Sequence, residues 1–102
     1  MQHHYPSSSL TRIIDQSLFY QCACPAQVCR SILDLRELHD YQLNCGNDSA
    51  NDKSVHDAIA DAACAAHAGM EQCLTNILAI EGWDLQTLSM PEALRKKPAK
   101  LL

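Results

Sequence analysis

The sequence predicts an all-α fold, an antiparallel helical bundle of three main helices plus a short C-terminal helix. Apolar residues make up 47% of the 102 residues, which is enough for a core, while aromatic residues contribute only 5%. Alanine, leucine and isoleucine supply most of this apolar content, and the scarcity of aromatic residues favours packed helices over sheets. A chain of this length is typical of one domain. We therefore expect a single helical domain over residues 1–102, with residues 1–7 and 96–102 as frayed tails.

The first helix is predicted over residues 8–22. Ser7, Ser8 and Ser9 offer N-capping hydroxyls at its start. Apolar residues follow at helical spacing, namely Leu10, Ile13, Ile14 and Leu18. Pro25 cannot continue this helix, because it lacks a backbone N–H, but it suits the first turn of a new one.

The second helix is predicted over residues 25–43. Its inward side is expected to hold Val28, Ile32, Leu35 and Leu38. Its outward side is expected to hold Arg30, Asp34, Arg36, Glu37 and Asp40. The polar, turn-rich segment 45–51 then predicts a loop.

The third helix is predicted from residue 51, 52 or 54 to Glu81, with Gly82 as a left-handed C-cap. A heptad-like apolar stripe, expected to face the core, consists of Ile59, Ala63, Ala66, Met70, Cys73, Ile77 and Ile80. At 1.5 Å per residue this helix is roughly 45 Å long. The first two helices then either lie end to end against it or fold back as separate struts. Residues 89–92 resemble a capping box that opens a final helical turn or two, through Leu94.

The charge of the chain argues against nucleic acid as a partner, and the lack of a long apolar run argues against a membrane. Eight basic and twelve acidic side chains give a net charge of −4. The basic run lies at the C-terminus, where Arg95, Lys96, Lys97 and Lys100 are typical of a solvated tail. No apolar run approaches the roughly 18–20 residues of a spanning helix, and residues 1–9 lack the charged and apolar regions of a signal peptide. We therefore expect a cytoplasmic protein with reduced thiols.

Six cysteines are the most informative feature for function. Cys22, Cys24 and Cys29 surround the junction of the first two helices, where a helix N-terminus favours the thiolate. Thiolates bind zinc, copper(I) and iron–sulfur clusters, and Cys45 or His39 could complete a tetrahedral site if the second helix folds back or the chain dimerises. The Cys-x-Cys-Pro-x-x-x-Cys spacing matches neither zinc ribbons nor ferredoxins. The alternative is that these thiols fill the core.

A second candidate site lies on the third helix. Cys64, His67 and Glu71 share one flank, and His56 returns to almost the same face three turns earlier. Imidazole, carboxylate and thiolate groups on one line fit a transition metal. The alternative, which we favour for His67, is a hydrogen-bonded core histidine. Glu71 is then a solvated edge carboxylate and Cys73 a core residue.

Missing motifs exclude several enzyme classes. The chain has no Glu-x-x-His pair, no His-Glu-x-x-His, no Cys-x-x-Cys and no glycine-rich phosphate loop. Cys64 and His67 could form a nucleophile–base pair, but a position in mid-helix on an alanine-rich face is poor for meeting substrate. The sequence therefore does not indicate an enzyme.

The sequence thus predicts a small cytoplasmic protein, rich in cysteine and histidine, that binds zinc (Zn), copper (Cu) or an iron–sulfur (Fe-S) centre as a carrier or sensor. The candidate metal ligands are Cys22, Cys24, Cys29, Cys45, His39, Cys64, His67 and Glu71. One alternative is a helical protein–protein assembly module, a self-associating homodimer whose cysteines are core residues. Another is a thiol redox protein in which Cys24 attacks and Cys22 or Cys29 resolves.

Overall fold

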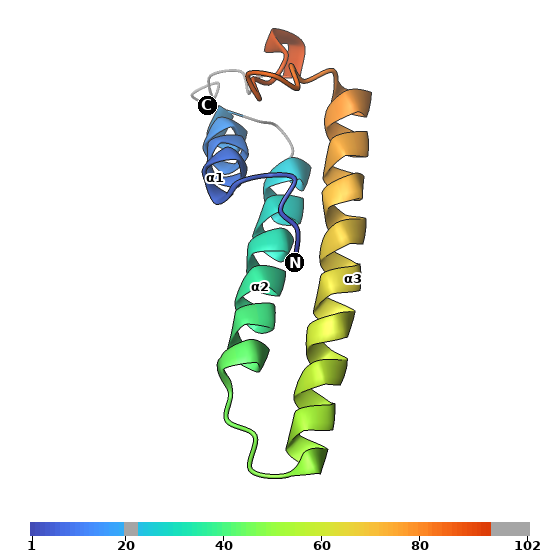
Figure 1. Ribbon diagram of the computed structural model, residues 1–102. Helices are drawn as coiled ribbons and strands as arrows, with labels where there is room; N and C mark the ends of the chain where they lie inside the picture. Colours follow the sequence, from blue (N-terminus) through green and yellow to red (C-terminus); the bar gives the residue numbers. More distant parts are fainter. Residues whose placement is uncertain (20–22, 95–102) are drawn as a thin grey trace, which may run out of the picture.

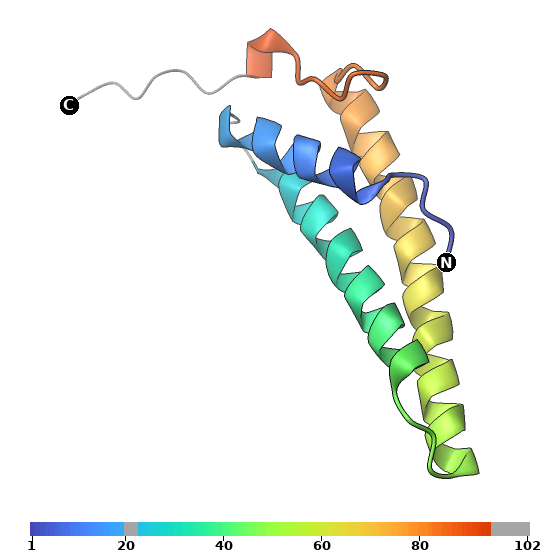
Figure 2. The same cartoon turned by 60° about the vertical axis from the view of Figure 1, so that its left-hand side comes forward.

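The protein is all-α, as predicted. The computed structural model describes residues 1–19 and 23–94, which form the α-helices α1 (Ser7–Gln16), α2 (Cys24–Asn44) and α3 (Ala50–Glu81). Helices α2 and α3 run antiparallel as a long hairpin, and α1 crosses one face of it near the end where α2 begins and α3 ends (Figures 1 and 2). The first two helices therefore fold back on each other instead of lying end to end.

The first helix is shorter than predicted. It ends at Gln16 and passes into a 3₁₀ turn, Ser17–Phe19. The Ser17 hydroxyl donates to the carbonyl of Ile13 at 2.9 Å, a bond of the kind that competes with regular helix. Residues 20–22, the end of the predicted helix, lie outside the described residues. Pro25 occupies the first turn of α2, as predicted.

The ends of α3 are set by local hydrogen bonds. The Ser49 side chain accepts from the backbone N–H of Asp52 at 3.2 Å and caps the N-terminus. At the other end Gly82 adopts φ 80°, the left-handed conformation predicted for it. The chain then returns over the top of the hairpin to a 3₁₀ turn, Glu92–Leu94, where the short C-terminal helix is predicted.

The apolar core lies at one end of the molecule, where all three helices meet. Its buried members are Leu10, Ile13, Cys29, Ile32, Leu74, Leu78, Trp83, Leu88 and Met90. The molecule measures 60 × 31 × 18 Å, so the hairpin extends well beyond this core. Among the described residues, its loop end is formed by α2, α3 and the loop that joins them (Figure 1).

Both hairpin helices are rotated relative to the sequence prediction. The predicted stripe of α3 is its core face only in part. Ala63 is buried and Met70 and Ile77 pack against the core, whereas Ile80 is 82% exposed and Ala66 is exposed. The buried residues of α3 are Ala60, Ala63, His67, Glu71, Leu74 and Leu78. On α2 the predicted outward residue Arg36 is only 6% exposed, whereas the predicted inward residue Leu38 is 41% exposed.

Candidate functional site

Arg36 is the centre of a buried polar network that joins α2, α3 and the N-terminal segment. Its Nε donates to Nε2 of His67 at 2.9 Å, and its Nη2 lies 3.3 Å from Oε2 of Glu71. Its Nη1 donates to the Ser7 hydroxyl at 3.1 Å, and its Nη2 donates to the carbonyl of Tyr5 at 2.6 Å. A buried charge is tolerated when it is paired and hydrogen-bonded in this way. Pairing Arg36 with two α3 residues therefore fixes the rotation of both helices.

His67 is held as a neutral imidazole. Its Nε2 accepts from Arg36, and its Nδ1 lies 3.4 Å from Oε1 of Glu71. Burial lowers the pKa of His67, the Glu71 carboxylate acts in the opposite direction, and the Arg36 guanidinium lowers it further. Both ring nitrogens are thus engaged by protein groups, as the alternative interpretation of a hydrogen-bonded core histidine expects.

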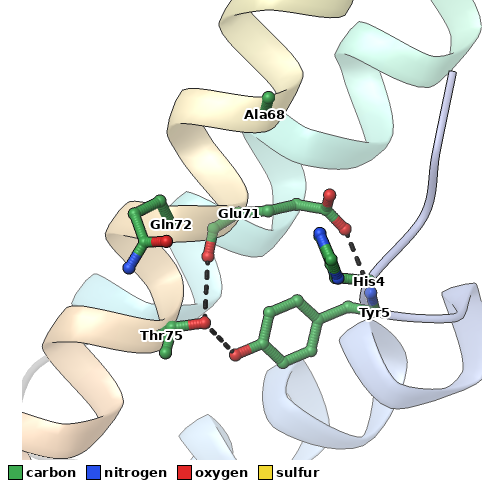
Figure 3. A pocket seen from close by; sticks show the side chains of 6 residues that line it. All are labelled: His4, Tyr5, Ala68, Glu71, Gln72 and Thr75. Atoms are coloured by element: carbon green, nitrogen blue, oxygen red, sulfur yellow. Dashed lines mark hydrogen bonds between the residues drawn. The ribbon is translucent and has the colours of Figure 1, made fainter.

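The N-terminal segment, residues 1–6, lies against the hairpin at this network. The Tyr5 N–H donates to Oε2 of Glu71 at 3.0 Å, and the Tyr5 hydroxyl lies 2.6 Å from the Thr75 hydroxyl (Figure 3). The ring of His3 lies 5.4 Å from that of His67, centroid to centroid. Tyr5 is therefore bound through its backbone and its side chain, in a segment that the sequence suggests as a frayed tail.

A pocket of about 530 Å³ opens beside this segment. It is lined by His4, Tyr5, Ala68, Glu71, Gln72 and Thr75 (Figure 3). Glu71 is buried, contrary to the expectation of a solvated edge carboxylate, and both its oxygens already have partners. Within the described part of the chain, no buried side-chain nitrogen or oxygen lacks a hydrogen bond. The pocket therefore presents no unsatisfied buried group to a ligand.

The predicted cysteine cluster is only partly described. Cys22 lies outside the described residues. Cys24 is exposed at the first position of α2. Cys29 is buried in the apolar core, and this burial raises its pKa to about 12. Without a bound metal, Cys29 is therefore a protonated thiol at neutral pH.

The other predicted ligands are spread along the hairpin. His39 is buried on α2, Cys45 is half-buried directly after α2, and Cys64 is half-buried on α3. His56 pairs with Asn47, whose Oδ1 lies 2.6 Å from its Nδ1. The structure does bring His67 and Glu71 together. Residues 1–19 and 23–94 contain no group of three or more His, Cys, Asp or Glu side chains placed to hold a metal ion. The metal-site hypothesis stays a prediction.

Sequence reasoning missed Arg36, although a signal for it exists. Cys29, Ile32, Arg36 and His39 are spaced three, four and three apart, which places them on one helix face. An arginine on a face that otherwise reads as core indicates a buried partner of opposite charge. That partner, Glu71, lies 35 residues away, so the pairing becomes visible only in the fold.

The opposite side of the hairpin carries an open apolar groove of about 390 Å³. Its lining is Leu35, Leu38, Ala58, Ile59, Ala62, Ala63 and Ala66. At 3.6 residues per turn, the α3 residues that line this groove lie roughly 160° around the helix from the α3 residues that line the pocket of Figure 3. The N-terminal segment covers the other side, so within the part of the chain that the structure describes the groove lining stays open to solvent.

The groove continues into a longer apolar surface along α3. Its heptad-spaced members, which we call the α3 seam, are Val55, Ile59, Ala62, Ala66, Gly69, Cys73, Asn76 and Ile80. Val55 and Ile80 at its two ends are 55% and 82% exposed. Between residues 62 and 80 the only Asp, Glu, Lys, Arg or His residues are His67 and Glu71, and both are buried. The exposed surface of this stretch of α3 therefore carries no charged side chain of these types.

None of the described helices is long and apolar enough to cross a membrane. Comparison with protein-family models, with curated proteins and with solved structures finds no match for this chain.

Proposed function

We propose that this protein is a helical assembly module that forms a homodimer through the groove and the α3 seam. The observation that carries the proposal is the groove itself, lined by seven apolar residues on a hairpin face that α1 and the N-terminal segment leave open. Burial of apolar surface contributes roughly 25 cal/mol of favourable free energy for each Å² removed from water. Contiguous exposed apolar surface of this kind is typical of protein–protein contact sites.

The size of the hairpin face fits a stable dimer. Each helix is ~10 Å wide with its side chains, and at 1.5 Å per residue α2 is ~32 Å and α3 ~48 Å long, so this face offers on the order of 800 Å² per chain. Stable interfaces bury about 800 Å² per partner. Two hairpins packed face to face would form a four-helix arrangement, in which helices cross at about 20°.

The composition of the α3 seam also favours helix pairing. Heptad spacing keeps the same residues facing a partner helix along its whole length. Ala62, Ala66 and Gly69 in its middle let a second backbone approach closely, while Val55 and Ile80 supply larger apolar groups at the ends. In this proposal Cys29 is a core residue and Cys73 an interface residue, and neither needs a metal.

The proposal is tested by placing a charge on the proposed interface. Ala62→Arg puts a guanidinium into the groove, whereas the matched control Ala68→Arg puts the same group on the side of α3 that faces the pocket of Figure 3. We expect Ala62→Arg to weaken the dimer about a hundredfold, or ~2.7 kcal/mol, because a buried unpaired charge is costly. Ala68→Arg should dimerise like the wild type.

Sedimentation equilibrium over a range of protein concentrations measures both effects. Circular dichroism of each variant shows whether its helix content is intact. A wild-type chain that stays monomeric at millimolar concentration would rule out the homodimer. Equal dimer affinity of Ala62→Arg and Ala68→Arg would rule out the groove as its interface.

A further inference from the structure

We infer that the two chains of the homodimer pair antiparallel, so that the acidic loop end of each hairpin meets the basic C-terminal end of the other. The inference rests on the proposed homodimer and specifies its geometry. It is carried by the charge distribution along the hairpin and by the residues that the α3 seam brings opposite one another.

The loop end of the hairpin is strongly acidic. Residues 34–61 contain seven acidic and two basic side chains, a net charge of −5. Arg36 is buried against Glu71, which lies outside this range, so Lys53, paired with Asp57 at 2.6 Å, is the one basic residue that offsets surface charge here. Six of the seven carboxylates are exposed, namely Asp34, Glu37, Asp40, Asp48, Asp57 and Asp61.

Parallel pairing would place two such ends side by side. Like charges brought together across an interface repel and disfavour that arrangement. Antiparallel pairing instead separates the two acidic ends by most of the 60 Å length of the molecule. This distance is several times the Debye length of about 8 Å at physiological salt, so the repulsion is screened out.

The opposite end of the molecule supplies the complementary charge. The 3₁₀ turn Glu92–Leu94 lies at the end of the molecule opposite the loop end of the hairpin (Figure 1), and Leu94 packs against the apolar core. The sequence that follows it contains Arg95, Lys96, Lys97 and Lys100. Eight residues span at most ~28 Å, enough to reach the adjacent end of an antiparallel partner. Each dimer would then have two matched contacts between basic and acidic segments.

The α3 seam has a register that suits this orientation. An antiparallel pairing centred between Ala66 and Gly69 sets Ile80 opposite the partner's Val55 and Cys73 opposite the partner's Ala62. The two most exposed apolar side chains of α3, Ile80 and Val55, then cover each other at both ends of the seam. The small residues Ala66 and Gly69 meet in the middle, where two helices can approach most closely.

Cross-linking within isotopically mixed dimers tests the orientation. Full-length chains labelled with ¹⁴N and ¹⁵N are mixed, joined by a carbodiimide that links amines to carboxylates, and analysed by mass spectrometry. Links between a ¹⁴N and a ¹⁵N peptide connect different chains. We expect such links from Lys96, Lys97 or Lys100 to Asp48, Asp52 or Asp57. Mixed-isotope links from Lys53 to Asp48 or Asp57 would instead place two loop ends together and overturn the antiparallel arrangement.

The salt dependence of the dimer gives an independent answer. Raising NaCl from 50 to 500 mM should weaken an antiparallel dimer about tenfold, because salt screens the attraction between unlike ends. A dimer that tightens with salt would contradict the inference, because screening then relieves a repulsion. Sedimentation separates the two failures: absence of any dimer overturns the proposed function, whereas a dimer with parallel links or inverse salt dependence overturns only its orientation.

Discussion

The contacts of Arg36, His67 and Glu71 explain why an elongated hairpin has one defined packing. Long apolar helices can slide or rotate against each other with little loss of buried area. Three polar side chains on facing positions remove that freedom, because any other rotation leaves a buried charge without its partner. The cost of breaking one such pair is about 3–5 kcal/mol. The network therefore selects which faces of α2 and α3 meet, and so which faces remain open.

Protonation of His67 should destabilise the protein. Its folded-state pKa lies below the unfolded value of about 6.5, mainly because the ring is buried. As pH falls through this range, the unfolded chain binds a proton before the folded one does, so the free energy of unfolding decreases. The loss begins near pH 6.5 and levels off below the folded-state pKa. Urea denaturation at intervals between pH 5 and 8 measures this slope.

His67→Gln provides the matched comparison for this pH dependence. The amide oxygen of glutamine can still accept from Arg36, but the side chain does not titrate. The variant should therefore show a shallower dependence of stability on pH over the same interval. Equal slopes in the variant and the wild type would show that His67 is not the titrating group.

The residue scale is also where sequence reasoning succeeded in part. His67 on an apolar face was interpretable as a hydrogen-bonded core residue, and it is one. Its partner Arg36 lies 31 residues away on another helix, and no local pattern indicates which arginine meets which histidine. The side of α3 that Glu71 occupies follows from the same distant pairing, which is why its burial was not predicted.

At the scale of elements, helix ends were predictable because their causes are local. Gly82 follows the last helical residue and takes the left-handed conformation that glycine adopts without strain. Pro25 starts α2 for an equally local reason. The rotation of α3 about its axis was not predictable. Two apolar stripes share this helix. Only the network with Arg36 fixes the rotation in which the α3 seam faces outward.

Gly69→Ala should have opposite effects on the single chain and on the dimer. Gly69 is an exposed helical residue, and an added Cβ meets nothing within 4 Å. Alanine should therefore stabilise α3 by about 0.5–1 kcal/mol. In the proposed antiparallel register the same methyl group meets the partner's Ala66 and should weaken the dimer.

Two measurements separate these effects. Chemical denaturation at protein concentrations below dimerisation reports the gain in stability of the single chain. Sedimentation at higher concentration reports the dimer. A variant that is stabilised and dimerises as tightly as the wild type would place the centre of the interface away from Gly69.

At the scale of the whole molecule, the uneven core is the dominant feature. Trp83, Leu88 and Met90 close the core at the end where α1 crosses the hairpin, while the loop end has only two helices. Such an end has one contact between α2 and α3 and two outer faces. His39 and Gln42 are among the buried residues of α2, so the buried side of this helix includes polar side chains near the loop end.

Chelation distinguishes the assembly module from the predicted metal carrier. If the cysteines are core and interface residues, treatment with EDTA and 1,10-phenanthroline should leave helix content and dimer affinity unchanged. If a metal holds the junction of α1 and α2, chelation should reduce helix content, since binding and folding are coupled in such sites. Circular dichroism at 222 nm, with elemental analysis of the untreated protein, measures the difference.

The attachment of the N-terminal segment has a consequence for how the chain is made. Tyr5 bonds to Glu71 and Thr75, 66 and 70 residues further along the sequence. At synthesis rates of about 5–20 residues per second, those partners are added roughly 3–14 s after Tyr5 itself. The α2–α3 hairpin needs only nearer contacts and closes at lower entropic cost. Tyr5 therefore leaves the ribosome before its partners are synthesised and reaches its native position only after both have been added.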